Sequence, residues 1–491
     1  MPPHAAPSRL PSPLLALMAA YLLGVPLLLP VVTPGLLAYD GARVLQLLCM
    51  PLLAAVALQA PVPALSSRMA WGAAALAALG VLSSALAANP AMGLREVLNL
   101  ASLLAVGAVL ASQGRQTLEL LPKVAALAVA VYAVPVLGMA VLGATEGLPI
   151  AADMPLPGFA NRRYLNHVQT VALPLAAFGV LQFRSALGRL LTGAGLVASA
   201  TLLWITLGRG SLFGLAAALL VWGLCWRRGQ ANARPNLGVL GGSLALGAVL
   251  SALLQGWSGG LAQAAGLARD AGPVELASDH SRFSLWIRAW DMAIGSPWLG
   301  AGPMHYAMGN HPKAAHPHNE PLQWLAEWGW PATLLAALLL AMLARAAWRR
   351  QRSSAGQPAT LGAAVLAAWA CVFVDSWFSG LWVMPVSQTW LAALIGFSWA
   401  WWVTSAPETT TETATAPTPA VRRWHGLPLL LTGALLVQTL PELIRLPEHL
   451  QDVKRAFPGD GPRPRFWSHG QIGPANPTTP ATTPATPAPH P

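Results

Sequence analysis

A chain of 491 residues that is 55% hydrophobic and only 10% charged is too apolar for a soluble protein, in which about a quarter of the residues carry charge. Its net charge of +11 does not by itself indicate a nucleic-acid partner, because basic residues in a membrane protein collect in the cytoplasmic loops. Cys49, Cys225 and Cys371 all lie in apolar runs without metal-ligand spacing, so we interpret them as small core residues.

Most of the chain reads as membrane-spanning helix, which needs about 20 apolar residues to cross a bilayer. Twelve runs qualify approximately, at 13–33, 42–60, 67–87, 94–113, 119–143, 165–183, 190–207, 210–226, 236–254, 321–344, 359–380 and 384–404. The first is too long for a signal-peptide core and is expected to be a retained anchor. The predicted fold class is an all-α polytopic membrane protein, with nine spans in residues 1–254 and three in residues 321–404.

The C-terminal region is less regular. Residues 425–457 hold a further apolar run at 426–440, either a thirteenth span or an interfacial helix, and an amphipathic stretch at 447–457 that predicts a short surface helix. Residues 405–424 and 458–491 are rich in Pro, Thr and Ala and cannot bury a core. We expect the first to be a disordered linker and the second a disordered tail.

Arginine-rich short loops orient the chain. They lie at 184–189, 227–234 and 345–352, on alternate turns, so the positive-inside rule places them in the cytoplasm. The long loop 255–320, between the ninth and tenth spans, and the smaller loop 144–164 then lie outside.

A group of basic residues remains on the outer face, where this sorting disfavours positive charge. Its members are Arg162, Arg163, Arg209, Arg269, Arg282, Arg288 and Lys313. Arginine predominates, as is typical where a planar guanidinium binds phosphate oxygens through two hydrogen bonds. The sequence therefore indicates an anionic ligand. The alternative is that long loops cross the membrane whatever their charge and that lipid head groups attract arginine.

Two polar residues border or enter predicted spans. Arg209 lies at an outer helix junction, where a basic residue is typically functional, although an arginine at a helix end can also extend to the membrane surface. Asp375 lies within the eleventh span and must be paired or protonated. We interpret it as a counter-ion for one of the outer arginines.

The long loop contains a predicted helix over 283–294, whose apolar residues form one stripe, as in a helix packed on a membrane surface. Arg282 precedes this helix, and free backbone N–H groups at a helix start favour an anion. Arg288 lies further along and either contributes to the same site or pairs with Asp291.

Histidines gather at the end of this loop, in His316-Pro317-His318-Asn319-Glu320, directly before a span. A neutral imidazole at the membrane boundary can take a proton from a hydroxyl group, and nearby arginines disfavour its protonated form. We assign that role to His318 and interpret His280, His305, His311 and His316 as ordinary surface histidines. A metal site at His316, His318 and Glu320 is the less favoured alternative, since no metal-binding motif is present.

The order of these motifs resembles the bacterial O-antigen ligase family, which shares a superfamily with O-antigen polymerases and lipid-linked O-oligosaccharyltransferases. The resemblance rests on Gly158-Phe159-Ala160-Asn161, on Gly208-Arg209-Gly210, on Arg282 with Trp286, on Pro297-x-x-Gly300-x-Gly302, and on His318-Asn319 followed after nine residues by Gly329. The family pattern continues with Gly, Thr or Tyr three residues after that glycine, where this chain has Ala332.

The resemblance implies a GT-C-like glycosyltransferase of the bacterial inner membrane, with its active site facing the periplasm and no metal or other cofactor. It would transfer O-antigen from undecaprenyl pyrophosphate to the lipid A-core oligosaccharide. Arg209, Arg282 and Arg288, with Arg162 and Arg163 in support, would bind the pyrophosphate, and His318 would activate the acceptor for an inverting displacement. Asn319 and Asp375 would support them. Besides membrane lipids, no other partner is implied.

Three other functions remain open. An O-antigen polymerase or a protein O-oligosaccharyltransferase would keep the donor and the base but change the acceptor. A lipid-linked glycan flippase would also need basic residues, but along a passage through the membrane. Here the charge lies mainly outside, and the spans carry mainly Lys123 and Asp375.

Overall fold

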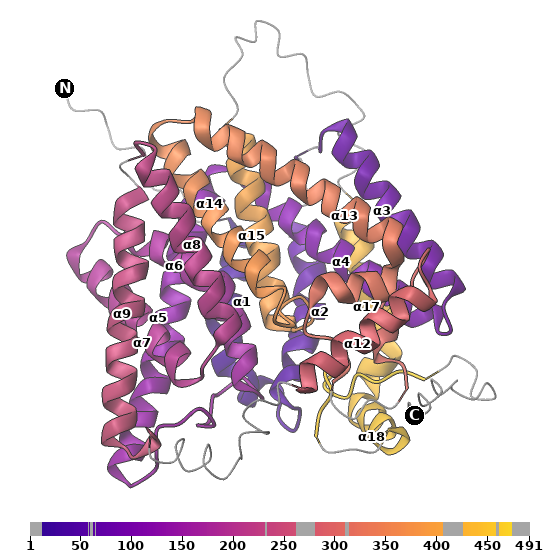
Figure 1. The fold of residues 1–491 in the computed structure, drawn as a ribbon, viewed down its shortest axis with the longest axis horizontal. Helices are drawn as coiled ribbons and strands as arrows, with labels where there is room; N and C mark the ends of the chain where they lie inside the picture. Colours follow the sequence, from indigo (N-terminus) through magenta and orange to yellow (C-terminus); the bar gives the residue numbers. More distant parts are fainter. Residues whose placement is uncertain are drawn as a thin grey trace, which may run out of the picture.

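The computed structural model (Figure 1) describes residues 12–56, 58, 62–63, 65–230, 233–261, 280–309, 314–405, 426–457 and 461–473. Within them the chain forms fifteen α-helices and a short 3-10 helix, η2. The helices are α1 (Pro13–Val32), α2 (Ala38–Val56), α3 (Ser67–Leu86), α4 (Pro90–Ala111), α5 (Arg115–Thr145), α6 (Arg162–Val180), α7 (Ala186–Ile205), α8 (Arg209–Arg227), α9 (Ala233–Trp257), α12 (His280–Gly295), η2 (His305–Ala307), α13 (Glu320–Ser353), α14 (Gly356–Asp375), α15 (Pro385–Thr404), α17 (Leu427–Ile444) and α18 (Leu446–Ala456). Arg269, His311, Lys313, nearly all of the expected linker and the end of the expected tail lie outside the described residues.

The expected all-α membrane fold is confirmed, and every expected span corresponds to a helix. Among the described residues, 10 helices are long and apolar enough to cross a membrane, and α17, left open by the sequence, is one of them. Helices α2, α6 and α15 occupy expected spans but are too polar to meet this criterion. The chain is therefore a multi-pass membrane protein. Its more polar helices must be surrounded differently from the apolar ones.

Helix α6 shows why hydropathy underestimates the bundle. It packs against α5, α7, α14 and α15, and its polar residues beyond the first turn, Asn166, His167, Gln169 and Thr170, are buried. The Asn166 side chain donates to Thr206 Oγ1 at 2.8 Å, and Gln169 Nε2 donates to the Ser199 carbonyl at 2.8 Å. A helix enclosed by other helices does not face lipid, so interhelical hydrogen bonds can replace apolar side chains along it.

Two arginine-rich loops meet at one end of the bundle. Gln351, near the end of α13, donates to Gln230 Oε1 at 2.7 Å, and the Arg228 guanidinium lies 4.7 Å from the centre of the Trp348 ring. Helix α8 begins at Arg209 and ends beside these residues, so Arg209 lies at the opposite end of the bundle. The fold thus separates the arginine-rich loops from the expected functional residues.

In the long loop, α12 packs on α13 and η2 through buried Leu285 and Ala289. Its other face is apolar and exposed, through Phe283, Ile287, Trp290 and Ile294. A face of this kind is suited to a membrane surface, where the sequence analysis expected this helix.

The start of α13 is fixed by a close approach of two backbones. Gly329 interrupts the helix with φ of 77°, and Gly300 has φ of 69°. A Cβ atom on Gly329 would lie 2.7 Å from Gly300 N, which no side chain tolerates. Hydrogen bonds from Ala301 N to Ala326 O at 2.9 Å and from Gly302 N to Glu327 O at 3.0 Å close the contact. The Gly300 turn and the Gly329 position, which are far apart in the sequence motifs, therefore form one close backbone contact.

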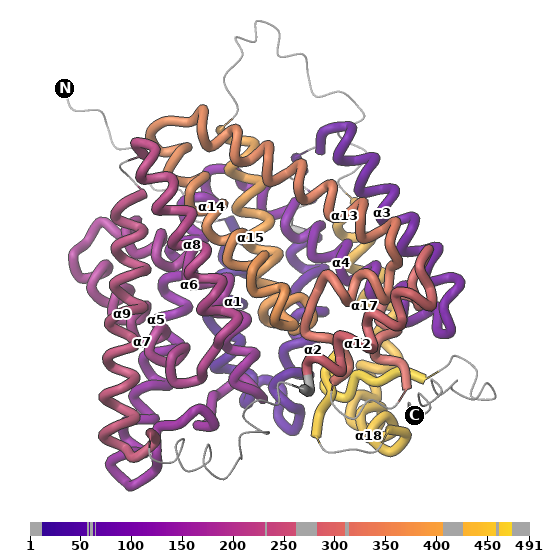
Figure 2. The backbone as a smooth tube through the Cα atoms, viewed as in Figure 1, coloured from indigo at the N-terminus to yellow at the C-terminus, as the bar shows by residue number. Residues whose placement is uncertain are grey.

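The C-terminal region differs from the expectation of a disordered tail. Residues 461–473, which we call the C-terminal strap, return beside α18 and below α12 (Figure 2). Phe466 and Trp467 are 3% and 2% exposed, and Ile472 exchanges backbone hydrogen bonds of 3.0 Å with Ala307 and Gly309. The strap is therefore packed against the loop that leads to His318. Proline and polar residues concealed this in the sequence, because the strap has no periodic apolar pattern of its own.

Buried polar contacts hold the strap in place. Arg465 is 2% exposed and forms an ion pair of 2.6 Å with Glu327 of α13. The Ser468 hydroxyl donates to Asp40 Oδ2 at 2.6 Å, which ties the strap to α2. Because these charges are removed from water, each depends on its partner.

We expect Arg465→Met to lower the free energy of unfolding by about 3–5 kcal/mol, since it leaves Glu327 buried without its partner. The thermal unfolding midpoint in detergent measures this. Arg455→Met is the control, because its pair with Asp452 is exposed, with side chains 76% and 67% accessible. The double variant Arg465→Met/Glu327→Gln should lose less than Arg465→Met alone. An unchanged midpoint for Arg465→Met contradicts the prediction.

Candidate functional site

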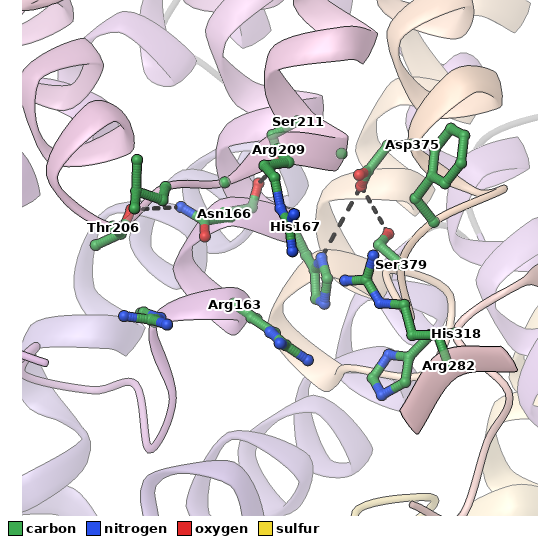
Figure 3. Close-up of a pocket in the computed structure, with 15 residues that line it drawn as sticks. Arg163, Asn166, His167, Thr206, Arg209, Ser211, Arg282, His318, Asp375 and Ser379 are labelled. Atoms are coloured by element: carbon green, nitrogen blue, oxygen red, sulfur yellow. Dashed lines mark hydrogen bonds and ion pairs between the residues drawn. The ribbon is translucent and has the colours of Figure 1, made fainter. Parts of the chain in front are cut away.

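A cavity of about 260 Å³ lies at the end of the bundle opposite the arginine-rich loops, where α6, α8 and α12 begin and α14 ends. This is close to the lower end of the range for small-molecule sites, roughly 300 Å³. The ionisable residues that line it are Arg162, Arg163, Arg209, Arg282, His167, His318 and Asp375 (Figure 3). Four arginines therefore face a single carboxylate, which makes the cavity suited to an anion.

Helix starts add to this positive field. Arg162 and Arg209 are the first residues of α6 and α8, and Arg282 is in the first turn of α12. Backbone N–H groups and the positive end of the helix dipole favour anions at such positions. The arginine side chains and the backbone at these helix starts thus both favour a negatively charged ligand.

The positions on either side of Arg209, Gly208 and Gly210, have no room for a side chain. A Cβ atom on Gly208 would lie 2.7 Å from Asn166 Cγ, and one on Gly210 would collide with the Asp375 carboxylate. The turn between α7 and α8 can approach α6 and α14 only because both positions lack a side chain. This approach brings Arg209 to the cavity wall.

His318 is held by three helices. It adopts φ of 54°, a left-handed conformation that is uncommon outside glycine and costs free energy. Trp286 of α12 donates from Nε1 to the Pro317 carbonyl at 3.1 Å. Asn319 caps the start of α13 and donates to the Trp377 carbonyl, beyond α14, at 3.1 Å. The residues on both sides of His318 are therefore fixed, and the ring lines the cavity.

Arg282 and Arg288 have different positions, although the sequence placed both in one site. Arg282 lies one turn before Trp286 on the same helix face, so it lines the cavity with His318. Arg288 lies over the Tyr306 ring at 5.3 Å and donates to the Met308 carbonyl at 3.4 Å. Six residues rotate a helix by about 240° beyond a full turn, so Arg288 faces another direction. It does not line the cavity.

The pKa of His318 is lowered to about 3, mainly by burial and also by Arg163, His167 and Arg282. Its imidazole is therefore neutral at physiological pH, as a base must be before it accepts a proton. An anion in the cavity would offset the arginines and raise this pKa, which would make the ring a stronger base.

Two of the expected surface histidines are buried. His316 is 2% exposed, and its ring centre lies 4.0 Å from that of His318. A Cβ atom on Gly380 would lie 3.0 Å from His316 Nδ1, so that glycine leaves room for the ring. His305 is also 2% exposed and accepts a hydrogen bond from Asn89 N at 2.9 Å. His316 therefore packs directly on His318, whereas His305 links η2 to the start of α4. The side chain of His280 and all of His311 lie outside the described residues.

Asp375 lines the cavity, but its hydrogen-bond partners are hydroxyl groups rather than arginines. Its Oδ2 atom accepts hydrogen bonds from Thr170 at 3.1 Å and Ser379 at 2.7 Å, and lies 3.9 Å from His167 Nδ1. The sequence analysis missed His167 altogether. The available signal was its position four residues after Arg163, which places both on the same face of a helix that begins in the outer loop.

No group of three His, Cys, Asp or Glu residues in the described part of the chain is arranged to hold a metal ion. His316, His318 and Glu320, considered as metal ligands from the sequence, form no such group. Positive charge in the cavity comes from arginine.

Comparison with known proteins supports the resemblance. Residues 194–337 match the family model described as O-antigen ligase, which confirms the resemblance to that family. The matched region contains Arg209, Arg282 and His318, whereas Arg162, Arg163, His167 and Asp375 come from helices on either side of it. No curated protein matches the sequence. The family match indicates a glycosyltransferase-type enzyme that acts on lipid-linked glycans.

The cavity should bind inorganic pyrophosphate. Arg209→Gln and Arg282→Gln should each raise its dissociation constant roughly tenfold or more, since a hydrogen bond to a charged group contributes about 1.5–3 kcal/mol. Isothermal titration calorimetry on the detergent-purified protein measures this. Arg288→Gln is the matched control and should bind normally, because Arg288 lies outside the cavity. Equal weakening by all three substitutions would contradict the assignment.

Proposed function

We propose that the protein is an O-antigen ligase, which transfers O-antigen polysaccharide from undecaprenyl pyrophosphate to the lipid A-core oligosaccharide. The observation that carries the proposal is the meeting of arginines from α6, α8 and α12 with His318 in one cavity. The family match covers the elements that supply Arg209, Arg282 and His318. A diphosphate fits this cavity chemically, because several guanidinium groups can share its charge.

The arginines act on the leaving group. Arg209 and Arg282 bind the pyrophosphate, with Arg162 and Arg163 at the rim. Negative charge on the pyrophosphate increases as its bond to the anomeric carbon breaks, so these contacts strengthen toward the transition state and accelerate the reaction. No metal is needed in this scheme, since arginine supplies the charge. Arg288 has no part in it, because it faces the Tyr306 ring instead.

His318 acts on the acceptor. Its neutral imidazole takes the proton from the sugar hydroxyl as the oxygen attacks the anomeric carbon. The pyrophosphate departs from the opposite face, so the configuration inverts. Asn319, Trp286 and Trp377 hold the turn and keep the ring in place.

The membrane position follows from the same geometry. The arginine-rich loops face the cytoplasm by the positive-inside rule, which puts the cavity on the periplasmic side of the bacterial inner membrane. The exposed apolar face of α12 then lies against the lipid surface from which a polyprenyl-linked donor arrives. A flippase would carry charge along a passage through the membrane, whereas the charge in this cavity gathers at one end of the helices.

A polymerase or a protein O-oligosaccharyltransferase would use the same donor site and the same base. The acceptor alone distinguishes them from a ligase. The decisive experiment therefore identifies which glycan accumulates when transfer stops.

A bacterial strain that lacks this protein should accumulate full-length O-antigen on undecaprenyl pyrophosphate and lose it from lipid A-core. Complementation with His318→Ala should not restore transfer, because the acceptor then has no base. Mass spectrometry of extracted lipid-linked glycans measures both.

The control is His449→Ala, which should restore transfer, since His449 belongs to α18 and does not line the cavity. Accumulation of single repeat units would identify a polymerase instead. Normal transfer by His318→Ala would refute the assignment of the base.

The pH profile tests the state of His318. Its lowered pKa, about 3, means that the free enzyme keeps the active neutral form as the pH falls, until it nears that value. The kcat/KM should therefore show no acid limb near the ordinary histidine value of about 6.5. Arg282→Gln removes one cause of the shift and should move the acid limb to higher pH. A wild-type limb near the ordinary value contradicts the prediction.

A further inference from the structure

His167 is the second imidazole of the cavity, and the mechanism above does not use it. It lies on α6, one turn after Arg163, and is 4% exposed. Figure 3 shows the ring between Asp375 on one side and the space bordered by Arg163 and Arg282 on the other. The ring therefore lines the cavity itself and can contact a ligand bound there.

In the part of the chain that the structure describes, three buried polar atoms of the cavity lining have no hydrogen-bond partner. They are His167 Nδ1, Asp375 Oδ1 and Asn166 Oδ1. The 3.9 Å between His167 Nδ1 and Asp375 Oδ2 is too long for a hydrogen bond. Buried polar atoms without partners are rare and indicate a ligand, a water or a proton that the site handles. The three residues all line the cavity.

The two imidazoles have different electrostatic surroundings. His167 lies beside the Asp375 carboxylate, whereas the groups that act on His318 in the cavity are Arg163, Arg282 and the neutral His167. Arg163 on its own helix, Arg209 on α8 and Arg282 on α12 oppose a proton on either ring while the cavity holds no anion. A diphosphate offsets these arginines for both rings, but only His167 also has a carboxylate to stabilise its protonated form.

We propose that His167, oriented by Asp375, takes up a proton when the diphosphate donor binds and gives it to the departing diphosphate. This proposal rests on the proposed function, because it assigns the acid for the leaving group of that reaction. His167 is then a catalytic residue and Asp375 a positioning residue. In this proposal, one cavity holds two histidines, and the Asp375 carboxylate beside only one of them makes that one the acid and the other the base.

The proton balance closes over one turnover. The acceptor oxygen forms its bond to the anomeric carbon while the bond from that carbon to the phosphate oxygen breaks, and its electron pair leaves with the phosphate. His318 gains the acceptor proton, and protonated His167 gives its proton to the departing phosphate. His318 then releases its proton to water, and His167 takes up another when the next donor binds.

Calorimetry with undecaprenyl pyrophosphate tests the uptake directly. The purified full chain in detergent is titrated at pH 7 in two buffers of different ionisation enthalpy, which gives the number of protons bound with the ligand. Wild type should take up about one proton more than His167→Gln, because glutamine keeps a donor near Nε2 but does not titrate. His318→Ala should retain the wild-type number. Asp375→Asn should take up less than wild type, and it also serves if His167→Gln does not fold.

Kinetics supply a second readout that a packing role would not change. The wild-type kcat should fall at high pH, as His167 in the complex loses its proton. His167→Gln should lack this basic limb. Its kcat at neutral pH should be at least tenfold lower, since general acid catalysis typically contributes 10²–10⁴-fold. The double variant His167→Gln/Asp375→Asn should be no slower than His167→Gln, because both changes remove one function.

Equal proton uptake by wild type and His167→Gln, or a basic limb that persists in the variant, overturns the inference. These outcomes are separate from failure of the proposed function. A protein that takes up the proton but does not transfer glycan to lipid A-core contradicts the ligase assignment and supports the role of His167 toward the diphosphate.

Discussion

The hydrogen bond from Trp286 Nε1 to the Pro317 carbonyl joins the two halves of the candidate site. It fixes α12 against the turn that carries His318, and Arg282 lies one turn earlier on the same helix face. One contact therefore places the Arg282 guanidinium and the His318 imidazole in the same cavity. The turn holds His318 at positive φ, a conformation that persists only where the surroundings determine it fully. Asn319 supplies the remaining support by linking α13 to the end of α14.

Charged residues are arranged differently around the C-terminal strap and around the cavity. Around the C-terminal strap the charges are paired, as in Arg465 with Glu327 at 2.6 Å and Arg95 with Glu442 at 2.7 Å. In the cavity, four arginines face one carboxylate, and Asp375 is bonded to hydroxyl groups. Pairing is what a structural role requires, because an unbalanced buried charge is costly. The cavity arginines are not buried in this way, since Arg162, Arg163 and Arg209 are exposed and Arg282 is half-buried. Their excess over carboxylate therefore carries no such cost, and it favours an anionic ligand.

The sequence predicted the helices, and part of the residue set that shares the cavity, for identifiable reasons. Most spans follow from apolar length, although α2, α6 and α15 are too polar for that criterion. His318, Arg209 and Arg282 stood out as polar residues at the ends of predicted helices. Arg288 was misplaced because sequence spacing gave no information on which face of α12 meets His318. His167 was missed because it lies in a helix read as a span, where a buried histidine looks like packing. The strap was read as tail because only contacts with distant helices, such as that of Arg465 with Glu327, make it ordered.

The arrangement of His318 and His167 suggests how the proposed site avoids acting before the donor is present. In the cavity without an anion, the arginines disfavour a proton on both rings, so His318 is neutral but His167 has no proton to give and no acid is prepared. A bound diphosphate changes the field for both, yet the Asp375 carboxylate stabilises the proton on only one of them. In the proposed complex, the substrate itself separates the two imidazoles into acid and base. The chemical asymmetry thus comes from the donor and a single carboxylate, and the helices need only hold both rings in one cavity.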